Sequence, residues 1–148
     1  MPEITRQQLI LALISAGPNP RLAGVNLIQI DATRLDLTGA NLKQAAMTSA
    51  KLRETVLRNA SLFYADLTLA QLPGADLLSA NCTGANFTGA NLQSSNLARA
   101  ILSKANISDA NLLGAVMTGA TIDGLISNQN TVWPDGRRGT QSNAGNYV

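Results

Sequence analysis

The chain has 148 residues, enough for one domain, and its 11 basic and 9 acidic residues give a net charge of +2. So small an imbalance does not by itself indicate a nucleic acid or an acidic partner. The sequence has no histidine, the commonest general base and metal ligand, and its single cysteine excludes an internal disulfide. Only 3% of the residues are aromatic, so alanine and leucine have to supply any core.

Residues 4–17 predict a short helix that caps the N-terminal end of the domain. Thr5 and Gln8 have the spacing of a capping box, and Gly17 with Pro18 ends the helix. The apolar residues expected on one helical face are Leu9, Ile10, Leu13 and Ile14. We expect this face to pack on the structure that follows.

The same segment argues against a membrane role. Its longest apolar run, residues 9–16, is too short to span a bilayer, and the helix lacks the basic polar face of membrane-surface helices. Arg6 is the only positive side chain before the run, and Glu3 offsets it, so no signal peptide is predicted. We expect a soluble, cytoplasmic protein without membrane contact.

Residues 20–124 repeat with a period of five, in 21 pentapeptides without insertion or deletion. A large, mostly apolar residue recurs at every fifth position, as in Leu92 and Leu97, and a small residue, usually alanine, lies two places before it. Residues two apart on an extended segment point to the same side, so the small and the large residue both point inward. Glycine often ends the pentapeptide, and Pro73 precedes one such glycine, which indicates a turn at this place.

The phrase A-(N/D)-L-x-x, seen in ANCTGANFTGANLQS, resembles the pentapeptide-repeat family over about 105 of the 148 residues. The resemblance implies an all-β solenoid: a right-handed quadrilateral β-helix of about five coils, here with an N-terminal α-helical cap. The family is abundant in cyanobacteria, and most members there have no assigned biochemistry. The chain is therefore interpreted as a single domain, 1–148. The resemblance predicts its fold but assigns it no specific function.

Residues 125–148 are expected to form a C-terminal cap and a mobile tail. The stretch NTVWPDGRRG contains a turn signal at Pro134 and Gly136, and it resembles the T-x-W-P-D-G segment that follows the repeats in many bacterial members. We expect the ring of Trp133 to cover the open core of the last coil. Residues 140–148 are polar and contain glycine, which is typical of a mobile end.

Outward-pointing apolar side chains mark a candidate protein-interaction surface. Phe63 and Tyr64 occupy the corner of the ASLFY repeat, where most repeats carry small, polar or charged residues. The complete candidate surface consists of Phe63, Tyr64, Leu69 and Leu78. The alternative is that both rings lie flat over neighbours on the stacked coils, such as Lys43 and Gly84.

A second candidate surface is a basic edge. Its members are Arg34, Lys51, Arg53 and Arg58. Because Glu54 lies among them, a solvated charged edge is favoured over a nucleic-acid site, which needs a dense basic stripe with aromatic residues. Nucleic acid is therefore not expected as a partner.

The sequence contains no motif typical of nucleophilic catalysis, phosphate binding or metal binding. Cys82 falls in the large-residue position and is expected to pack as a core side chain. The repeat carboxylates stand where asparagine stands elsewhere, which is typical of turn-bonding surface residues. We expect no catalytic residues, no cofactor, no metal and no small-molecule substrate.

These observations predict a non-catalytic structural or protein-interaction module, monomeric or weakly dimeric, that binds another protein. The family resemblance offers one alternative, the inhibition of DNA gyrase by a rod that resembles duplex DNA. That activity requires a strongly negative surface, and none of the four sides implied by the repeat is strongly acidic.

Overall fold

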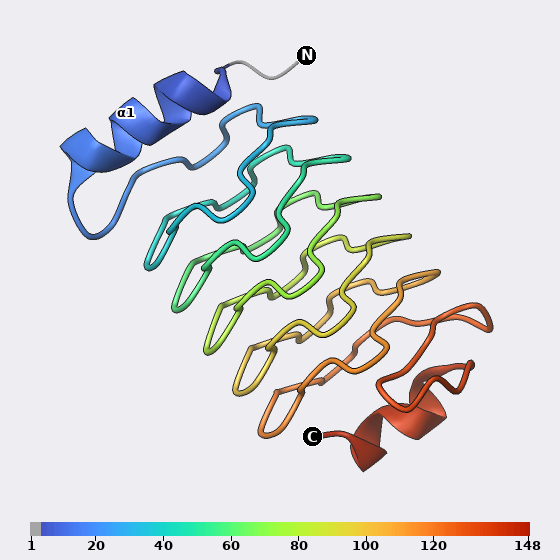
Figure 1. The fold of residues 1–148 in the computed structure, drawn as a ribbon. Helices are drawn as coiled ribbons and strands as arrows, with labels where there is room; N and C mark the ends of the chain where they lie inside the picture. Colours follow the sequence, from blue (N-terminus) through green and yellow to red (C-terminus); the bar gives the residue numbers. More distant parts are fainter. Residues whose placement is uncertain (1–3) are drawn as a thin grey trace.

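The computed structural model describes residues 4–148, which form a rod of stacked coils closed at each end by a short helix (Figure 1). Helix α1, Arg6–Ala16, lies across the first coil, and the 3₁₀ helix η1, Gln141–Asn146, lies at the opposite end. Between them the chain pairs through isolated parallel β-bridges. The two ends of the described chain therefore lie at opposite ends of the rod.

Each coil contains 20 residues. In each pentapeptide one outward residue forms a bridge with the residue 20 positions later, from Arg21 with Asn41 to Asn106 with Ile126. Because four pentapeptides fill one coil, each pentapeptide forms one side of a square and ends in a corner. We number the sides from residue 20, so that residues 20–24, 40–44 and every later set 20 apart form the first side.

Every corner has the same backbone geometry. After Leu92, for example, the N–H of Ser95 donates to the Leu92 carbonyl over 3.1 Å, and Ser94 has a φ of 54°. A positive φ at the third of four residues is the signature of a type II turn. All 21 pentapeptides end in a residue with positive φ, and eight of these residues are glycine. The turn that glycine and Pro73 indicate in the sequence is confirmed.

Adjacent coils are joined by a regular hydrogen-bond ladder. The N–H of Asn91 donates to Ala70 in the preceding coil over 2.9 Å, and the N–H of Leu92 donates to Asn111 in the next coil over 2.7 Å. The corner N–H of Ser94 donates to Leu113 over 2.9 Å. Each side thus bonds in both directions along the rod, and this satisfies backbone groups that would otherwise be costly to bury.

The predicted division into inward and outward residues is confirmed. Cys82, Phe87 and Leu92 are at most 1% exposed, whereas Asn91 is only half-buried. The outward asparagine is also used locally, because Oδ1 of Asn91 accepts the N–H of Gln93 over 3.1 Å and so supports the corner that follows. Inward residues therefore form the core, and outward residues brace the turns.

Helix α1 matches the sequence prediction in part. The capping box between Thr5 and Gln8 is confirmed, and Leu9 is fully buried in the core. The expectation that Ile14 shares the buried face is wrong, because Ile14 is 75% exposed. The helix lies across the end of the rod, so only the stripe around Leu9 and Leu13 meets the core, and Ile14 is turned outward.

At the other end the repeat register changes by one residue. Asn111 pairs with Val132, and Val132 also pairs antiparallel with Arg138 across the predicted turn at residues 134–136. Trp133 is fully buried, as expected of a residue that covers the core, and its indole Nε1 donates to the Gly139 carbonyl over 2.9 Å.

The segment expected to include a mobile tail contains η1, buries Ala144, and stacks the ring of Tyr147 on Trp133 with the centroids 5.7 Å apart. The aromatic ring of the penultimate residue, Tyr147, provides the packing that a purely polar tail would lack.

Two buried hydroxyls in the small-residue position give opposite predictions for stability. Ser95 is fully buried and, among the described residues, its hydroxyl has no hydrogen-bond partner, whereas Thr55 donates to the Ala32 carbonyl over 2.8 Å. We expect Ser95→Ala to raise the free energy of unfolding by about 1 kcal/mol and Thr55→Ala to lower it by about 1–3 kcal/mol. Urea unfolding followed by circular dichroism measures both changes. A loss of stability in Ser95→Ala would contradict the prediction.

Candidate protein-interaction surface

Phe63 and Tyr64 form a single aromatic unit at the corner after the first side. They are the two central residues of a type II turn, and Tyr64 has a φ of 53°. Their rings meet edge to face, with centroids 4.6 Å apart and planes inclined by 78°. Phe63 is 37% exposed and Tyr64 is 54% exposed. The turn therefore presents two linked rings at the surface of the rod.

Part of this unit is packed on the next coil. A Cβ added to Gly84 would lie only 2.7 Å from Cε1 of Tyr64, so the tyrosine ring lies against the glycine corner 20 residues later. Leu69 lies against Gly89 in the same way, with a corresponding distance of 2.8 Å from Cδ2. The alternative expected from the sequence, in which a ring covers Gly84, thus holds for one side of Tyr64. The other side remains exposed.

The four predicted surface residues do not form one patch. Phe63 and Tyr64 touch each other, whereas Leu69 lies at the following corner, with the outward carboxylate of Asp66 on the side between them. Leu78 lies two corners further along the coil and is only half-buried. The structure therefore brings together the aromatic pair and leaves the two leucines at separate edges.

A hydrogen-bonded ladder of polar side chains runs beside the aromatic pair on the second side. Asp66 accepts from the hydroxyls of Thr48 and Thr68, and Asn86 donates to Thr68 and accepts from Thr88. Burial alone would raise the pKa of Asp66, but the hydrogen bonds from Thr68 and Thr48 outweigh it and hold this pKa below its ordinary value. The carboxylate is thus ionised and engaged within its own side.

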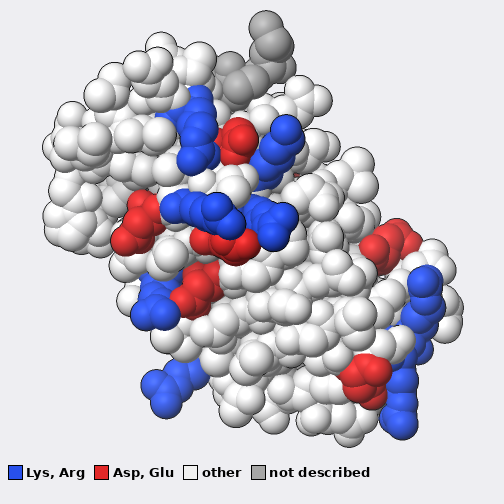
Figure 2. All heavy atoms as spheres, viewed as in Figure 1, with Lys and Arg blue, Asp and Glu red and all other residues white. Residues whose placement is uncertain are grey.

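The predicted basic edge is largely paired with carboxylates. Glu54 accepts from Arg34 over 2.6 Å and from Arg53 over 3.1 Å, and Arg58 pairs with Asp76. The hydrogen bonds from Arg34 and Arg53 lower the pKa of Glu54. Figure 2 shows basic and acidic side chains interleaved near the N-terminal end of the face that it presents.

Lys51 lies near another carboxylate. Backbone and side-chain hydrogen bonds from Thr33 lower the pKa of Asp31, and the charges of Arg6 and Lys51 lower it further. The four cations predicted as a basic edge therefore lie among acidic groups, and they form no continuous positive stripe.

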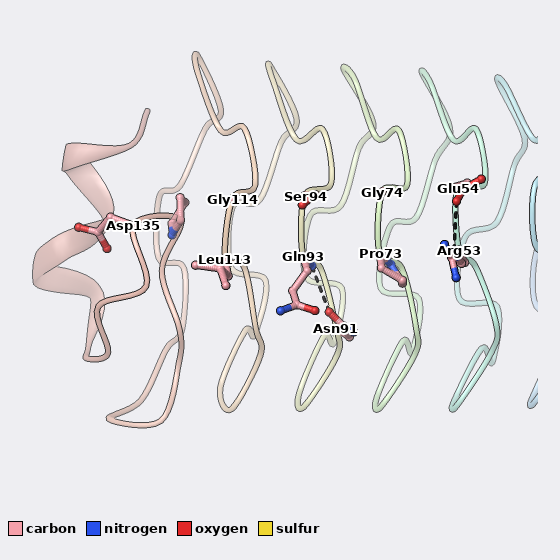
Figure 3. Close-up of a pocket in the computed structure, with 11 residues that line it drawn as sticks. Arg53, Glu54, Pro73, Gly74, Asn91, Gln93, Ser94, Leu113, Gly114 and Asp135 are labelled. Carbon is pink, nitrogen blue, oxygen red and sulfur yellow. Dashed lines mark hydrogen bonds and ion pairs between the residues drawn. The ribbon is translucent and has the colours of Figure 1, made fainter.

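A groove runs along the corner after the third side, and sequence reasoning missed it. It has a volume of about 710 Å³ and extends over successive coils to the C-terminal cap (Figure 3). Its floor is formed by the small corner residues Gly74, Ser94 and Gly114, which follow one another at the 20-residue spacing. Arg53 with Glu54 lines one end and Asp135 the other (Figure 3). Small residues repeated at one corner are the sequence signal that indicates such a groove.

Among the described residues, no three or more His, Cys, Asp or Glu side chains form a group that could hold a metal ion, and burial raises the pKa of the Cys82 thiol to about 12. A thiol of that pKa is inert as a nucleophile at neutral pH. Within residues 4–148, no helix is long and apolar enough to cross a membrane.

Known proteins resemble this chain in both sequence and fold. A family model described as pentapeptide repeats matches residues 21–53, 41–77 and 80–123, which together make up more than half of the chain. No curated protein sequence matches it.

Among solved structures, the pentapeptide repeat protein alr5209 from the cyanobacterium Nostoc PCC 7120 is 26% identical, with a TM-score of 0.57. That match covers 86% of this chain and 99% of alr5209. Rfr23 from the cyanobacterium Cyanothece 51142 is 27% identical over 86% of this chain and 99% of its own, with a TM-score of 0.46.

HetL from Nostoc sp. strain PCC 7120, a pentapeptide repeat protein involved in heterocyst differentiation regulation, is 31% identical with a TM-score of 0.40. The match covers 80% of this chain, which spans only 61% of the length of HetL. The repeat register, the corners and the family match lead to one conclusion. The chain belongs to the pentapeptide repeat family, whose members form right-handed β-helices.

Proposed function

We propose that this protein is a non-catalytic interaction module that binds another protein through the surface around Phe63 and Tyr64. The exposure of two linked aromatic rings at one corner of the rod carries this proposal. Aromatic side chains with an apolar body and a polar tip are enriched at protein interfaces, where they act as rigid anchors.

Stability alone gives a poor account of this pair. Every corner of the rod has a positive φ, so the backbone strain of Tyr64, about 1–3 kcal/mol for a bulky residue, follows from the fold and does not distinguish this corner. What distinguishes Tyr64 is its half-exposed aromatic ring, at a corner that glycine occupies in the next coil at Gly84. Packing on Gly84 covers part of the ring, and binding to a partner is the role that we assign to the exposed remainder.

The gyrase alternative is less well supported. The second side has an acidic excess of only Asp66 and Asp109, and the first side is positive, with Arg21, Lys43 and Lys104 against Asp123. Mimicry of duplex DNA requires dense negative charge along the rod. A supercoiling assay separates the two functions, because our proposal predicts no inhibition of gyrase.

We expect Phe63→Ser/Tyr64→Ser to abolish capture of the partner while leaving the rod folded. Both side chains point outward, so the double variant should keep the circular dichroism spectrum of the wild type. The measurement is a pull-down from native lysate with immobilised full-length chain, compared by quantitative mass spectrometry. At least one protein should be enriched on the wild type and reduced tenfold or more on the variant.

A matched control tests whether other exposed apolar side chains also contribute to capture of the partner. Leu113 is 44% exposed and Ile126 is 51% exposed, and both lie away from the aromatic corner. Leu113→Ser/Ile126→Ser should therefore retain the partner. Equal recovery of the same proteins by all three baits would refute the assignment of the site to Phe63 and Tyr64.

A further inference from the structure

Helix α1 has a second apolar face, directed away from the rod. Leu11 is 58% exposed and Ile14 is 75% exposed, although Leu9 on the opposite side is fully buried. Residues three apart lie on the same side of a helix, and the half-buried Ile10 adjoins them. Leu9 and Leu13 pack against the core and Leu11 and Ile14 do not, so the outward face takes no part in capping.

The outward face is free of charge. Arg6 is the one charged residue in residues 4–20, and its guanidinium is held by the first coil. It donates to the Asp31 carbonyl over 2.7 Å and to the Thr33 carbonyl over 2.9 Å, and it pairs with the Asp31 carboxylate over 3.2 Å. A surface of this kind offers nothing to a charged partner and produces no repulsion against a copy of itself.

A hollow adjoins the same end of the helix. It has a volume of about 360 Å³, and the residues that line it are Leu13, Gly17, Pro18, Pro20, Asp36 and Thr38. Gly17 ends α1 with a φ of 68°, and a Cβ placed on it would meet no atom within 4 Å. A protruding apolar side chain, Ile14, thus stands three residues before a mostly apolar depression.

We infer that α1 is a self-association surface on which the α1 of a second copy of this chain packs around a two-fold axis. In such an interface the same patch serves both partners and must be complementary to itself. The protrusion at Ile14 and the hollow beside Gly17 provide this complementarity, because each copy contributes one of each. The helix face itself carries no charge, so the only like charges that oppose this association in the described part of the chain are the Asp36 carboxylates lining the two hollows.

Two other occupants fit less well. A membrane-surface helix carries lysine and arginine on its polar face, and residues 4–20 contain only the engaged Arg6. A large obligate partner would require more area than one short helix provides. Stable interfaces bury about 1,200–2,000 Å² in total, so the contact between two α1 helices forms a weak dimer that is populated at high protein concentration.

The dimer joins two rods at their N-terminal ends. Each rod keeps its own Phe63–Tyr64 corner, so the dimer would present the proposed binding surface twice and bind a multivalent partner more tightly. The association itself does not depend on what that corner binds. A negative result for self-association through α1 therefore leaves the proposed binding at Phe63 and Tyr64 unaffected, and the reverse also holds.

Cysteine cross-linking tests the contact directly. The native Cys82 is fully buried with a raised pKa, so a cysteine introduced on the surface is the reactive thiol of the chain. Under mild oxidation Ile14→Cys should give a disulfide-linked dimer as its main product, because Ile14 and the hollow beside it lie next to the two-fold axis of the proposed contact, which places the two introduced thiols within reach of each other. Ile126→Cys, at a 51% exposed site near the other end, should remain mostly monomeric. Equal cross-linking of both variants, or none in Ile14→Cys, overturns the inference.

Sedimentation velocity provides the measurement without covalent trapping. The full-length wild type should show concentration-dependent dimerisation, and Leu11→Gln/Ile14→Gln should weaken it at least tenfold. The matched variant Val116→Gln/Ile126→Gln also removes two exposed apolar side chains and should dimerise like the wild type. A wild type that stays monomeric at every concentration, or that instead binds phosphatidylcholine vesicles through Ile14, overturns the inference.

Discussion

Replacing Leu92 with aspartate is expected to unfold the rod. Leu92 is 1% exposed and lies in a coil with further coils on both sides, so the new carboxylate cannot reach water. Burying an unpartnered charged or polar group costs several kcal/mol, which is comparable to the total stability of about 5–15 kcal/mol of a typical domain. Circular dichroism during thermal and urea unfolding should show no cooperative transition for this variant.

The next residue provides the control. Gln93 points outward at the corner, so Gln93→Asp adds the same charge to the surface and should change stability by no more than about 0.5 kcal/mol. Equal destabilisation by the two variants would contradict the inward and outward assignment on which the fold rests. Leu92→Asn tests the contribution of charge, because it buries a neutral polar group and should be nearly as damaging.

The coils could be predicted from the sequence because every pentapeptide repeats the same pattern of one small and one large inward-pointing residue. Cys82 and Phe87 differ in size and chemistry from leucine, and both are nevertheless buried in the large-residue position. Position in the repeat thus decides burial more strongly than residue type. A register repeated over 105 residues fixes which positions of every pentapeptide face the core.

The corners could be predicted from the sequence only in part. Glycine and Pro73 indicate turns, but Tyr64, Leu69 and Arg34 adopt the same positive φ without being residues that favour it. The stacking of the coils explains why these residues adopt a positive φ. The N–H of Tyr64 donates to Thr83 in the next coil over 3.0 Å, so the hydrogen bonds between coils impose the turn on whatever residue occupies it.

The candidate sites were harder to predict, since they depend on where side chains from different coils meet. The ion pair between Arg34 and Glu54 joins residues 20 positions apart, and the groove over Gly74 exists because small residues coincide at one corner. The outward turn of Ile14 depends on how α1 lies on the first coil. The sequence pattern of one segment does not determine how that segment is oriented relative to another.

Replacing Trp133 with alanine is expected to open the C-terminal cap. The ring is fully buried, its Nε1 donates to Gly139, and it stacks on Tyr147. Removing a buried aromatic side chain of this size costs about 3–5 kcal/mol. Because the repeats of a solenoid contact mainly their neighbours, the loss should concentrate at this end of the rod.

Hydrogen exchange measured by mass spectrometry resolves where the protection is lost. In Trp133→Ala, the amides of Gly136 and Gly139, which bond within the terminal hairpin, should exchange much faster, whereas that of Leu22 in the first coil should not change. Tyr147→Ala removes the stacking and the hydrogen bond between the Tyr147 hydroxyl and the Asp135 carboxylate, and should have a smaller effect, about 1–3 kcal/mol. Uniform loss of protection along the whole rod would mean that the cap supports every coil, and that the coils are not the nearest-neighbour system that their hydrogen bonds describe.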